Sequence, residues 1–461
     1  MIPVLETARI AAERGVKATI VTTLANAHLV QPTVDRANSS ISPSQPLMEL
    51  RIIPFPASEF GLPEGCENLS VLPVSLAANF FNAVNALRAP LDALFRDLRP
   101  LDALISDALL HWTTDLAANH GVPRIIFQTS GLFPVCAAND LHLHRPHESI
   151  SSPSETFSIP GFPHPIKLTR AMLPEVFDFP FILDLLREAE LSSYGAIVNT
   201  FYALEPDYAD HYNKLGPRKV FLVGPVNLAG AQPTTDKKDD NPGLGRDATL
   251  RWLDGKEDHS VAYVSFGTTC RFSDEQLREL ALGLEAGGHP FVWALRAEGE
   301  AWMPEGYEKR VAGRGLVVRE WVPQPEILAH RAVGGFVVHC GWSSMMEGIC
   351  AGVAMATWPL HSEQFVNERF VVDVLRIGWP VWEGFKSVAD REKVVVPAAA
   401  VARAVARLMG GGDEMAAMRG RVRKLAEMGR RAVAEGGSSY EDMSRLIKEL
   451  MARRDENGKS E

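Results

Sequence analysis

The chain has no long apolar run, no Asp-x-Asp motif and no excess of positive charge. A transmembrane helix needs about 20 consecutive apolar residues, so no membrane span is expected. The formal net charge of −10 argues against nucleic-acid binding, which depends on clustered Lys and Arg. The five cysteines are scattered without metal-ligand spacing. They indicate reduced thiols of an intracellular protein, and we expect neither disulfides nor a bound metal.

The 461 residues include 46% hydrophobic and 23% charged positions, which is ordinary for a globular protein of about two domains. Short β-rich runs alternate with amphipathic stretches in the first half, at 16–21, 50–53, 103–106, 124–127, 196–200 and 220–224. The second half repeats the pattern at 261–267, 291–295, 316–320, 334–339 and 353–359. Such alternation predicts an α/β fold with two Rossmann-like, doubly wound domains.

A polar segment rich in Gly and Pro at 229–245 separates the two halves and is the predicted linker. The predicted domains are then 1–228 and 246–440, followed by a charged helical end at 441–461. The letters GLGRDA at 243–248 match a dinucleotide-binding fingerprint, but no strand precedes them. A nicotinamide-dependent dehydrogenase is therefore disfavoured.

Residues 334–351 predict a strand, a tight turn and the start of a helix. His339, Gly341 and Ser344 lie at this turn, where backbone N–H groups and the helix dipole favour an anion such as a diphosphate. Alternatively, Ser344 and Glu347 form a capping box, in which Glu347 only binds the backbone at the helix start. The residues alone leave both interpretations open.

Other candidate side chains follow neighbouring strands. Trp321 follows the run at 316–320, and its indole is suited to stacking on a planar base, although a single tryptophan is more often a core residue. Thr268 follows the run at 261–267 and is either a phosphate contact or an ordinary turn residue. Glu363 and Gln364 follow the run at 353–359, where a carboxylate and an amide can bind sugar hydroxyls.

Residues 321–364 closely resemble the signature box of plant family 1 UDP-glycosyltransferases. The resemblance rests on Trp321, the letters HCGW at 339–342 and the closing Gln364. It implies the GT-B arrangement, in which two Rossmann-like domains face a cleft and the C-terminal helix packs back on the first domain. A closing Gln is associated in that family with glucose as the transferred sugar.

The resemblance also assigns contacts with the sugar donor. Uracil would stack on Trp321 and pair with the Val322 backbone, while Gln324 and Glu347 would hold the ribose. Ser343 stands where the family has an Asn, which removes one amide donor near the sugar and the phosphates. The full set of implied donor-binding residues is Thr129, Thr268, Trp321, Val322, Gln324, His339, Gly341, Trp342, Ser343, Ser344, Glu347, Glu363 and Gln364.

Sugar transfer to a hydroxyl needs a general base on the acceptor and stabilisation of the leaving diphosphate. In the resembled family the base is a His that follows the first strand and directly precedes a helix. This chain begins Met1-Ile2-Pro3, in register with that helix, so the resemblance implies that the first strand and the His are absent and that the N-terminal domain is truncated. Asp107 matches the acidic partner that orients the His. His111 is a candidate substitute base if the stretch from Asp107 is helical.

The implied activity is inverting, metal-independent transfer of glucose from UDP-glucose to a hydroxyl of a small lipophilic plant metabolite, of the flavonoid, terpenoid or hormone type. UDP-glucose is the co-substrate and no other cofactor is expected. We expect an acceptor pocket around Phe80, Phe81, Phe127 and 179–181, in a cytoplasmic monomer. The alternative is a catalytically impaired UDP-sugar-binding protein, because the base is absent.

Overall fold

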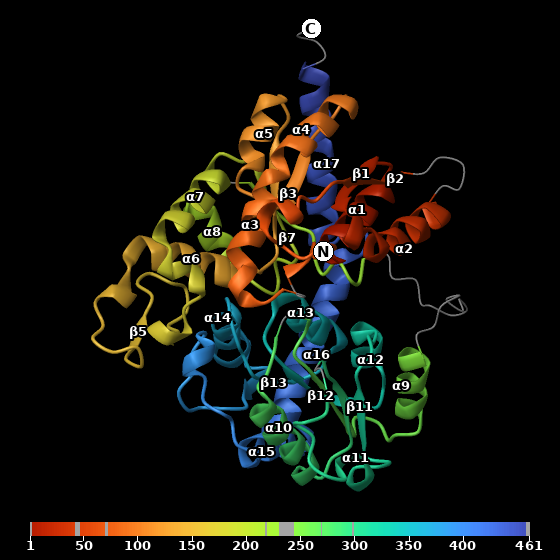
Figure 1. Cartoon of the computed structure of the whole chain (residues 1–461), viewed down its shortest axis with the longest axis vertical. Coiled ribbons are helices and arrows are strands. Elements are labelled where there is room, and N and C mark those ends of the chain that lie inside the picture. Colours follow the sequence, from red (N-terminus) through yellow and green to blue (C-terminus); the bar gives the residue numbers. More distant parts are fainter. Residues whose placement is uncertain are drawn as a thin grey trace.

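The computed structural model describes residues 2–41, 47–69, 72–216, 219–229, 244–268, 270–296 and 299–457. These residues form two α/β halves that follow one another along the long axis of the molecule, the N-terminal half above the C-terminal half in Figure 1. The predicted linker at 229–245 lies almost entirely outside the described residues.

The N-terminal half contains a four-stranded parallel sheet of order β3-β4-β7-β8, a separate parallel pair β1-β2 and an antiparallel pair β5-β6. Its strands are β1 Ala18–Thr23, β2 Met48–Ile53, β3 Leu104–Asp107, β4 Arg124–Gln128, β5 Thr156–Ser158, β6 Lys167–Thr169, β7 Gly195–Val198 and β8 Lys219–Leu222. Its helices are α1 Ile2–Ala12, α2 Leu24–Ile41, α3 Ala77–Ala86, α4 Arg88–Asp97, α5 Thr113–Asn119, α6 Leu132–His144, α7 Pro180–Leu191 and α8 Pro206–Lys214. Each β-rich run predicted in the first half overlaps one of these strands.

Strands β1 and β3 each keep one edge without a strand partner among the described residues, because β1 pairs only with β2 and β3 only with β4. Ile105, inside β3, is 41% exposed, although strands of parallel sheets are normally covered on both faces. The sheet of the N-terminal half is therefore divided between β1 and β3. The expected truncation of the first domain stays a prediction.

The C-terminal half contains one parallel sheet of order β11-β10-β9-β12-β13-β14. Every residue of β9 and β12 is buried, as expected for central strands with helices on both faces. The strands are β9 Val261–Ser265, β10 Phe291–Ala294, β11 Gly315–Val318, β12 Val333–Val338, β13 Met355–Thr357 and β14 Gly378–Pro380. The helices are α9 Leu244–Asp254, α10 Asp274–Ala286, α11 Tyr307–Arg310, α12 Gln324–Ala329, α13 Trp342–Ala351, α14 Gln364–Arg369, α15 Ala398–Met409, α16 Asp413–Val433 and α17 Ser438–Asn457. Strand β14 was not predicted.

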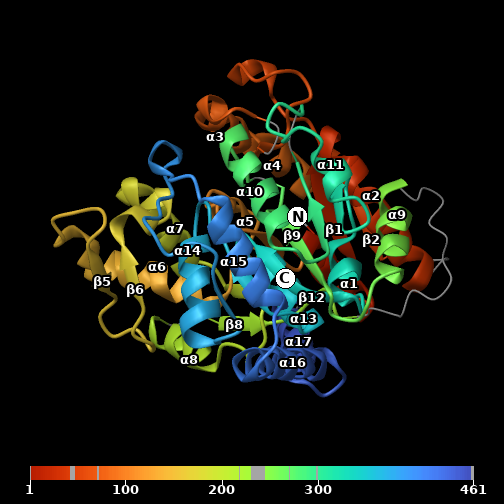
Figure 2. The same cartoon turned by 90° about the horizontal axis from the view of Figure 1, so that it is seen from below.

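The last two helices connect the halves. Helix α16 packs on α13, and α17 packs on β8 of the N-terminal half; Figure 2 shows both helices together on one side of the molecule. The Leu222 backbone N–H donates to Asp442 at 2.8 Å, and the Tyr194 hydroxyl donates to Glu449 at 2.7 Å. No helix among the described residues combines the length and the apolar character that crossing a bilayer requires.

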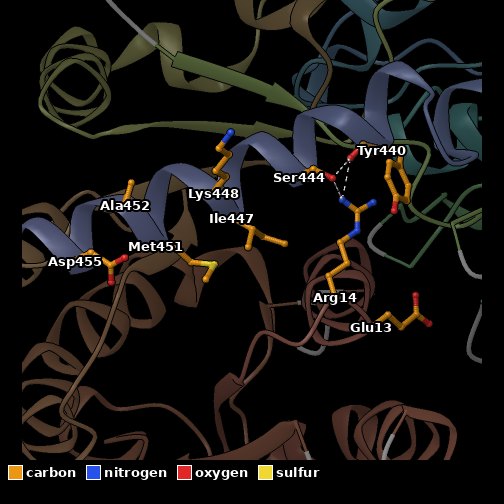
Figure 3. Close-up of a pocket in the computed structure, with 9 residues that line it drawn as sticks. All are labelled: Glu13, Arg14, Tyr440, Ser444, Ile447, Lys448, Met451, Ala452 and Asp455. Carbon is orange, nitrogen blue, oxygen red and sulfur yellow. Dashed lines mark hydrogen bonds between the residues drawn. The ribbon is translucent and has the colours of Figure 1, made fainter.

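A surface groove separates α1 from α17 (Figure 3). Arg14 projects from the end of α1 and donates to the Tyr440 backbone oxygen at 2.8 Å and to Ser444 Oγ at 2.9 Å. Its guanidinium also lies 4.1 Å from the centre of the Tyr440 ring, a distance typical of a cation–π contact. The polar groups at this end of the groove are therefore partnered with one another. Their contacts hold α17 against the end of α1.

Candidate functional site

The turn between β12 and α13 brings a histidine and two glycines together. The ring of His339 lies so close to Gly267 and Gly341 that a Cβ on either glycine would come within 2.8 or 2.4 Å of a ring atom. Gly267 has a φ of +72°, which glycine adopts without a steric penalty. The three residues, called the His339 niche below, lie at the N-terminus of α13. Backbone N–H groups and the helix dipole there favour an anion.

Burial determines the charge of His339. The residue is 8% exposed, and this burial lowers the pKa of its imidazole to about 4, with the nearby His361 adding to the shift. The ring is therefore neutral near pH 7 and can donate one hydrogen bond. An anion in the niche would be stabilised by hydrogen bonds and the helix dipole, without an ion pair to His339.

A polar network joins α12 to α13 beside the niche. Gln324 accepts a hydrogen bond from the Tyr263 hydroxyl at 3.2 Å and donates to Ser344 Oγ at 3.0 Å and Glu347 Oε2 at 2.7 Å. Burial raises the pKa of Glu347 to about 7, and the hydrogen bond from Gln324 opposes this shift. An amide, a hydroxyl and a carboxyl group at one place are suited to binding a diol such as a ribose.

The capping-box interpretation of Ser344 and Glu347 is wrong. Helix α13 begins at Trp342 with Gly341 as its N-cap, and no side chain caps this end. Ser344 therefore lies inside the first turn, and Glu347 binds Gln324 on the neighbouring helix. The pattern failed because the tight turn after His339 ends at Gly341 and starts the helix earlier than a Ser344 cap requires.

Exposed side chains follow two other strands at the same edge of the sheet. Trp321 lies beyond the end of β11 and is 65% exposed, whereas the adjacent Val322 is buried. Trp321 is therefore not a core residue, and its exposed indole is accessible to a planar ligand. Thr268 is exposed after Gly267, beyond the end of β9.

Glu363 and Gln364 lie at the start of α14 and have different surroundings. Ser130 of the N-terminal half donates its hydroxyl to Glu363 Oε1 at 2.9 Å. Gln364 is only 4% exposed, and its Oε1 accepts from the backbone N–H groups of Leu360 at 2.9 Å and His361 at 3.2 Å. Glu363 therefore lies at the junction of the two halves, while the Gln364 carbonyl oxygen is used by its own turn.

Trp342 is a contact between the halves. It is 2% exposed and donates its indole N–H to the backbone oxygen of Asn199 at 2.9 Å. The indole covers Gly131, where a Cβ would come within 2.1 Å of the ring. This placement leaves the backbone of Trp342, rather than its indole, for contact with a sugar.

Asp107 ends β3 and accepts a hydrogen bond from the Leu109 backbone at 2.8 Å. Burial raises the pKa of its carboxyl group. Within the part of the chain that the structure describes, no histidine is hydrogen-bonded to Asp107. The helical arrangement suggested for His111 is wrong, because His111 lies in a turn before α5. Thr129 is exposed directly after β4.

The prediction that Phe127 lines the acceptor pocket is also wrong. Phe127 is 1% exposed inside β4, because a central strand of a parallel sheet is covered on both faces. Phe80 packs against Phe55, with ring centroids 5.7 Å apart. Phe81, Phe179 and Phe181 are exposed and remain candidates for contact with an acceptor.

Several supporting residues had little signal in the sequence. Asn367 is fully buried and donates to the Cys340 backbone oxygen at 2.9 Å, which supports the turn where Cys340 has a φ of +63°. Cys270 Sγ lies 3.3 Å from His361 Nε2.

Ser343 is half-buried in the first turn of α13. In the described ranges, no three His, Cys, Asp or Glu residues are grouped so as to hold a metal ion.

Residues 240–376 match the family model described as UDP-glucoronosyl and UDP-glucosyl transferase. Scopoletin glucosyltransferase of Nicotiana tabacum is 41% identical to this chain over 465 residues, which cover 98% of this chain and 95% of the relative. The chain belongs to the plant UDP-glycosyltransferase family. UDP-glucose flavonoid 3-O-glucosyltransferase 7 of Fragaria ananassa is also 41% identical to this glycosyltransferase, with 97% and 93% of the two chains covered.

Solved structures agree with this assignment. UGT73P12 of Glycyrrhiza uralensis, complexed with glycyrrhetinic acid 3-O-monoglucuronide, matches the glycosyltransferase with a TM-score of 0.91 and 38% identity, covering 100% of this chain and 94% of that chain. UGT71G1 of Medicago truncatula, complexed with UDP-glucose, matches with a TM-score of 0.77 and 26% identity, covering 97% and 94%. The predicted GT-B fold and the predicted enzyme class, a UDP-glycosyltransferase, are both confirmed.

Proposed function

We propose that this glycosyltransferase transfers glucose from UDP-glucose to a hydroxyl of a small lipophilic plant metabolite, with inversion at the anomeric carbon and without a metal ion. Two relatives support this proposal. One is named a scopoletin glucosyltransferase and the other a flavonoid 3-O-glucosyltransferase, and each is 41% identical to this chain. UDP-glucose is bound in one of the similar structures. The acceptor is a phenolic or terpenoid compound, bound near the exposed Phe81, Phe179 and Phe181.

The observation that carries the proposal is the arrangement of donor groups at one edge of the C-terminal sheet. The exposed Trp321 can stack on uracil while the Val322 backbone pairs with the base edge. The network of Gln324 and Glu347 can hold the ribose hydroxyls. These groups and the His339 niche follow β11, β12 and β9, and ligands of open α/β sheets bind beyond the carboxyl ends of strands.

The chemistry follows from the charge that develops during transfer. When the bond between the anomeric carbon and the diphosphate breaks, negative charge grows on UDP. The N–H groups at the start of α13, with His339, Ser344 and Thr268, can stabilise that charge, and fixed donors are effective because they need no reorganisation. In-line attack by the acceptor oxygen from the opposite face of the sugar inverts the anomeric configuration.

The hexose lies, in this proposal, between the halves. Glu363 accepts hydrogen bonds from sugar hydroxyls, helped by the Gln364 amide group, the Trp342 backbone and the Thr129 hydroxyl. Ser343 contributes a single hydroxyl near the sugar and phosphates, with a shorter reach than an amide. We further propose that residues 1–228 bind the acceptor and 246–440 bind the donor, that 441–461 pack back on the first domain, and that the protein is a cytoplasmic monomer.

A second candidate function is UDP-sugar binding without transfer. It is favoured by one observation: no histidine in the described ranges is hydrogen-bonded to Asp107. Transfer requires a base for the acceptor hydroxyl, and among the described residues Asp107, whose pKa burial raises, is not paired with a histidine that could act as this base. Binding and transfer must therefore be measured separately.

The decisive test measures both properties with UDP-glucose and scopoletin. We expect a β-glucoside product and donor binding that weakens about 10- to 100-fold in Trp321→Ala, because base stacking on an aromatic ring contributes about 1–3 kcal/mol. Tyr202→Ala, which removes another exposed aromatic ring, is the matched control and should leave donor affinity unchanged. Donor binding with no product from scopoletin or from a flavonoid would favour the second candidate, and no donor binding would refute both.

A pH dependence follows from Glu347. Its pKa of about 7 lies above the ordinary value of 4.5, so the folded protein binds its proton more tightly than the unfolded chain. Stability from this group is therefore lost as pH rises from 4.5 to about 7. The ionised carboxylate accepts more hydrogen bonds from ribose hydroxyls, so affinity for UDP-glucose should rise about three- to tenfold between about pH 6 and 8.

Calorimetry in matched buffers measures this change, and Glu347→Gln provides the control because the amide does not titrate. UDP-glucose has no phosphate group that titrates in this range, unlike free UDP. Glu205 in the N-terminal half also has a pKa of about 7, and its carboxyl group caps α6. Its ionisation is the same in Glu347→Gln, so this variant separates the effect of Glu205 from that of Glu347. A pH dependence that survives in Glu347→Gln would contradict the assignment.

A further inference from the structure

The residues that precede α6 contact the C-terminal half at two points. Ser130 donates its hydroxyl to Glu363 Oε1 at 2.9 Å. The next residue, Gly131, lies under the indole of Trp342, where a Cβ would come within 2.1 Å of the ring. Both contacts belong to the junction of the two halves. The start of α6 therefore determines where the N-terminal half meets Glu363 and Trp342.

The close approach of this indole leaves α6 without a cap of its own. Gly131 is the N-cap of the helix, and it has no side chain that could accept a hydrogen bond. A capping residue such as serine or aspartate could not stand there without displacing Trp342. The first N–H groups of a helix still need acceptors, because an unpaired buried N–H is costly. The acceptors must come from another part of the chain.

Glu205 supplies these acceptors. Its Oε1 accepts from the Phe133 N–H at 2.7 Å, and its Oε2 accepts from the Leu132 N–H at 3.2 Å. The residue is fully buried, and the Thr200 side chain lies beside its carboxyl group. The helix dipole also favours negative charge at this end of α6. One carboxyl group thus replaces the cap that Gly131 cannot provide.

The backbone of Glu205 has a second role, because this residue is the N-cap of α8. Its carbonyl oxygen accepts from the Ala209 N–H at 2.9 Å. The loop between β7 and Glu205 begins with Asn199, whose backbone oxygen accepts the indole N–H of Trp342. Glu205 therefore joins the two loops of the N-terminal half that contact Trp342.

We propose that Glu205 is a positioning residue for the hexose of the sugar donor. Its carboxyl group fixes the first turn of α6 and with it Ser130, which directs the Glu363 carboxylate towards the sugar hydroxyls. The role of Glu205 rests on the proposed function, which places the hexose at the junction of the halves. Glu205 does not contact the sugar, since it is fully buried and both carboxyl oxygens bind α6.

Calorimetric titration of the full chain with UDP and with UDP-glucose isolates the contribution of the hexose. Glu205→Gln keeps the size of the side chain but replaces one acceptor oxygen by an amide NH₂ group, which cannot accept a backbone N–H. The ratio of the UDP-glucose dissociation constant to that of UDP should rise about five- to tenfold, with UDP affinity changed less than about twofold. A similar loss of affinity for both ligands would overturn the proposal, because a generally loosened fold would explain it.

Asp140→Asn is the matched control. Asp140 is also a buried acid between α6 and α8, and its Oδ2 lies 2.8 Å from Nε2 of His211. Both substitutions exchange a buried carboxyl group for an amide between the same two helices, but only Glu205 binds the turn that follows Ser130. The ratio of dissociation constants should change less than about twofold in Asp140→Asn. An equal rise in both variants, or no rise in Glu205→Gln, would refute the role of Glu205.

Ser130→Ala tests the same connection at a half-buried position, where the fold is not at risk. The ratio should rise about as much as in Glu205→Gln, and the double variant should exceed either single variant by less than about twofold, as for two groups that act through one contact. An unchanged ratio in Ser130→Ala would overturn the proposal even if Glu205→Gln did not fold. Absence of UDP-glucose binding in the unsubstituted chain would refute the proposed function as well, whereas the other contrary results refute the role of Glu205 alone.

Discussion

Replacement of Gly267 by alanine is expected to weaken UDP binding about 10- to 100-fold. A Cβ at this position would lie 2.8 Å from Cε1 and Nε2 of His339. The added methyl group must therefore displace the imidazole from the niche, where our proposal places the diphosphate. A hydrogen bond to a charged group contributes about 1.5–3 kcal/mol, which corresponds to the expected loss of affinity. Calorimetric titration with UDP measures it.

Gly288 provides a matched control for this experiment. Its φ of +74° is nearly the same as the +72° of Gly267, but a Cβ on Gly288 would meet no atom within 4 Å. Alanine at either site therefore has a similar backbone penalty of about 1–2 kcal/mol. Only Gly267→Ala should also lose UDP affinity. Equal UDP affinity in the two variants would show that the niche does not hold the diphosphate.

The residue pattern of strands and turns predicted the edge at which the donor groups gather. Parallel strands of the C-terminal half are nearly continuous apolar runs, and side chains that follow such runs meet at one edge of the sheet. His339 could be placed there because it ends such a run, and Trp321 and Thr268 because each directly follows one. The exposure of Trp321 could not be read from the run itself, and it decides against a core role.

The side-chain directions of residues 321–364 depend on packing against other segments, which the local sequence does not determine. The indole of Trp342 is fixed by Asn199 and Gly131, more than 140 and 200 positions away in the chain. The carbonyl of Gln364 is fixed by the turn at Leu360 and His361. A pattern of residue types gives the position of each side chain along the chain, whereas its partner is set by which segments meet in the fold.

Removal of the Trp342 indole is also expected to have a large effect, on stability. Trp342→Ala should lower the free energy of unfolding by about 3–5 kcal/mol, the usual range when a buried aromatic side chain is removed. The lost groups are a hydrogen bond to Asn199 and a ring that fills the space over Gly131, both in the other half. Denaturant titration measures the change. Trp342→Phe keeps most of the ring and should lose only about 1 kcal/mol.

Ligand binding then distinguishes two roles of the Trp342 indole, which either holds the two halves together or contacts the hexose directly. All proposed contacts with UDP belong to the C-terminal half and none uses the Trp342 indole, so affinity for UDP should change less than about threefold in Trp342→Ala, as for a side chain that does not contact the ligand. The transfer rate should fall more, because the hexose lies, in our proposal, at the junction of the two halves, which Ser130 and Glu363 join by a hydrogen bond. If instead UDP-glucose loses affinity while UDP does not, and stability is unchanged, the indole contacts the hexose directly and the two halves are held together by other contacts.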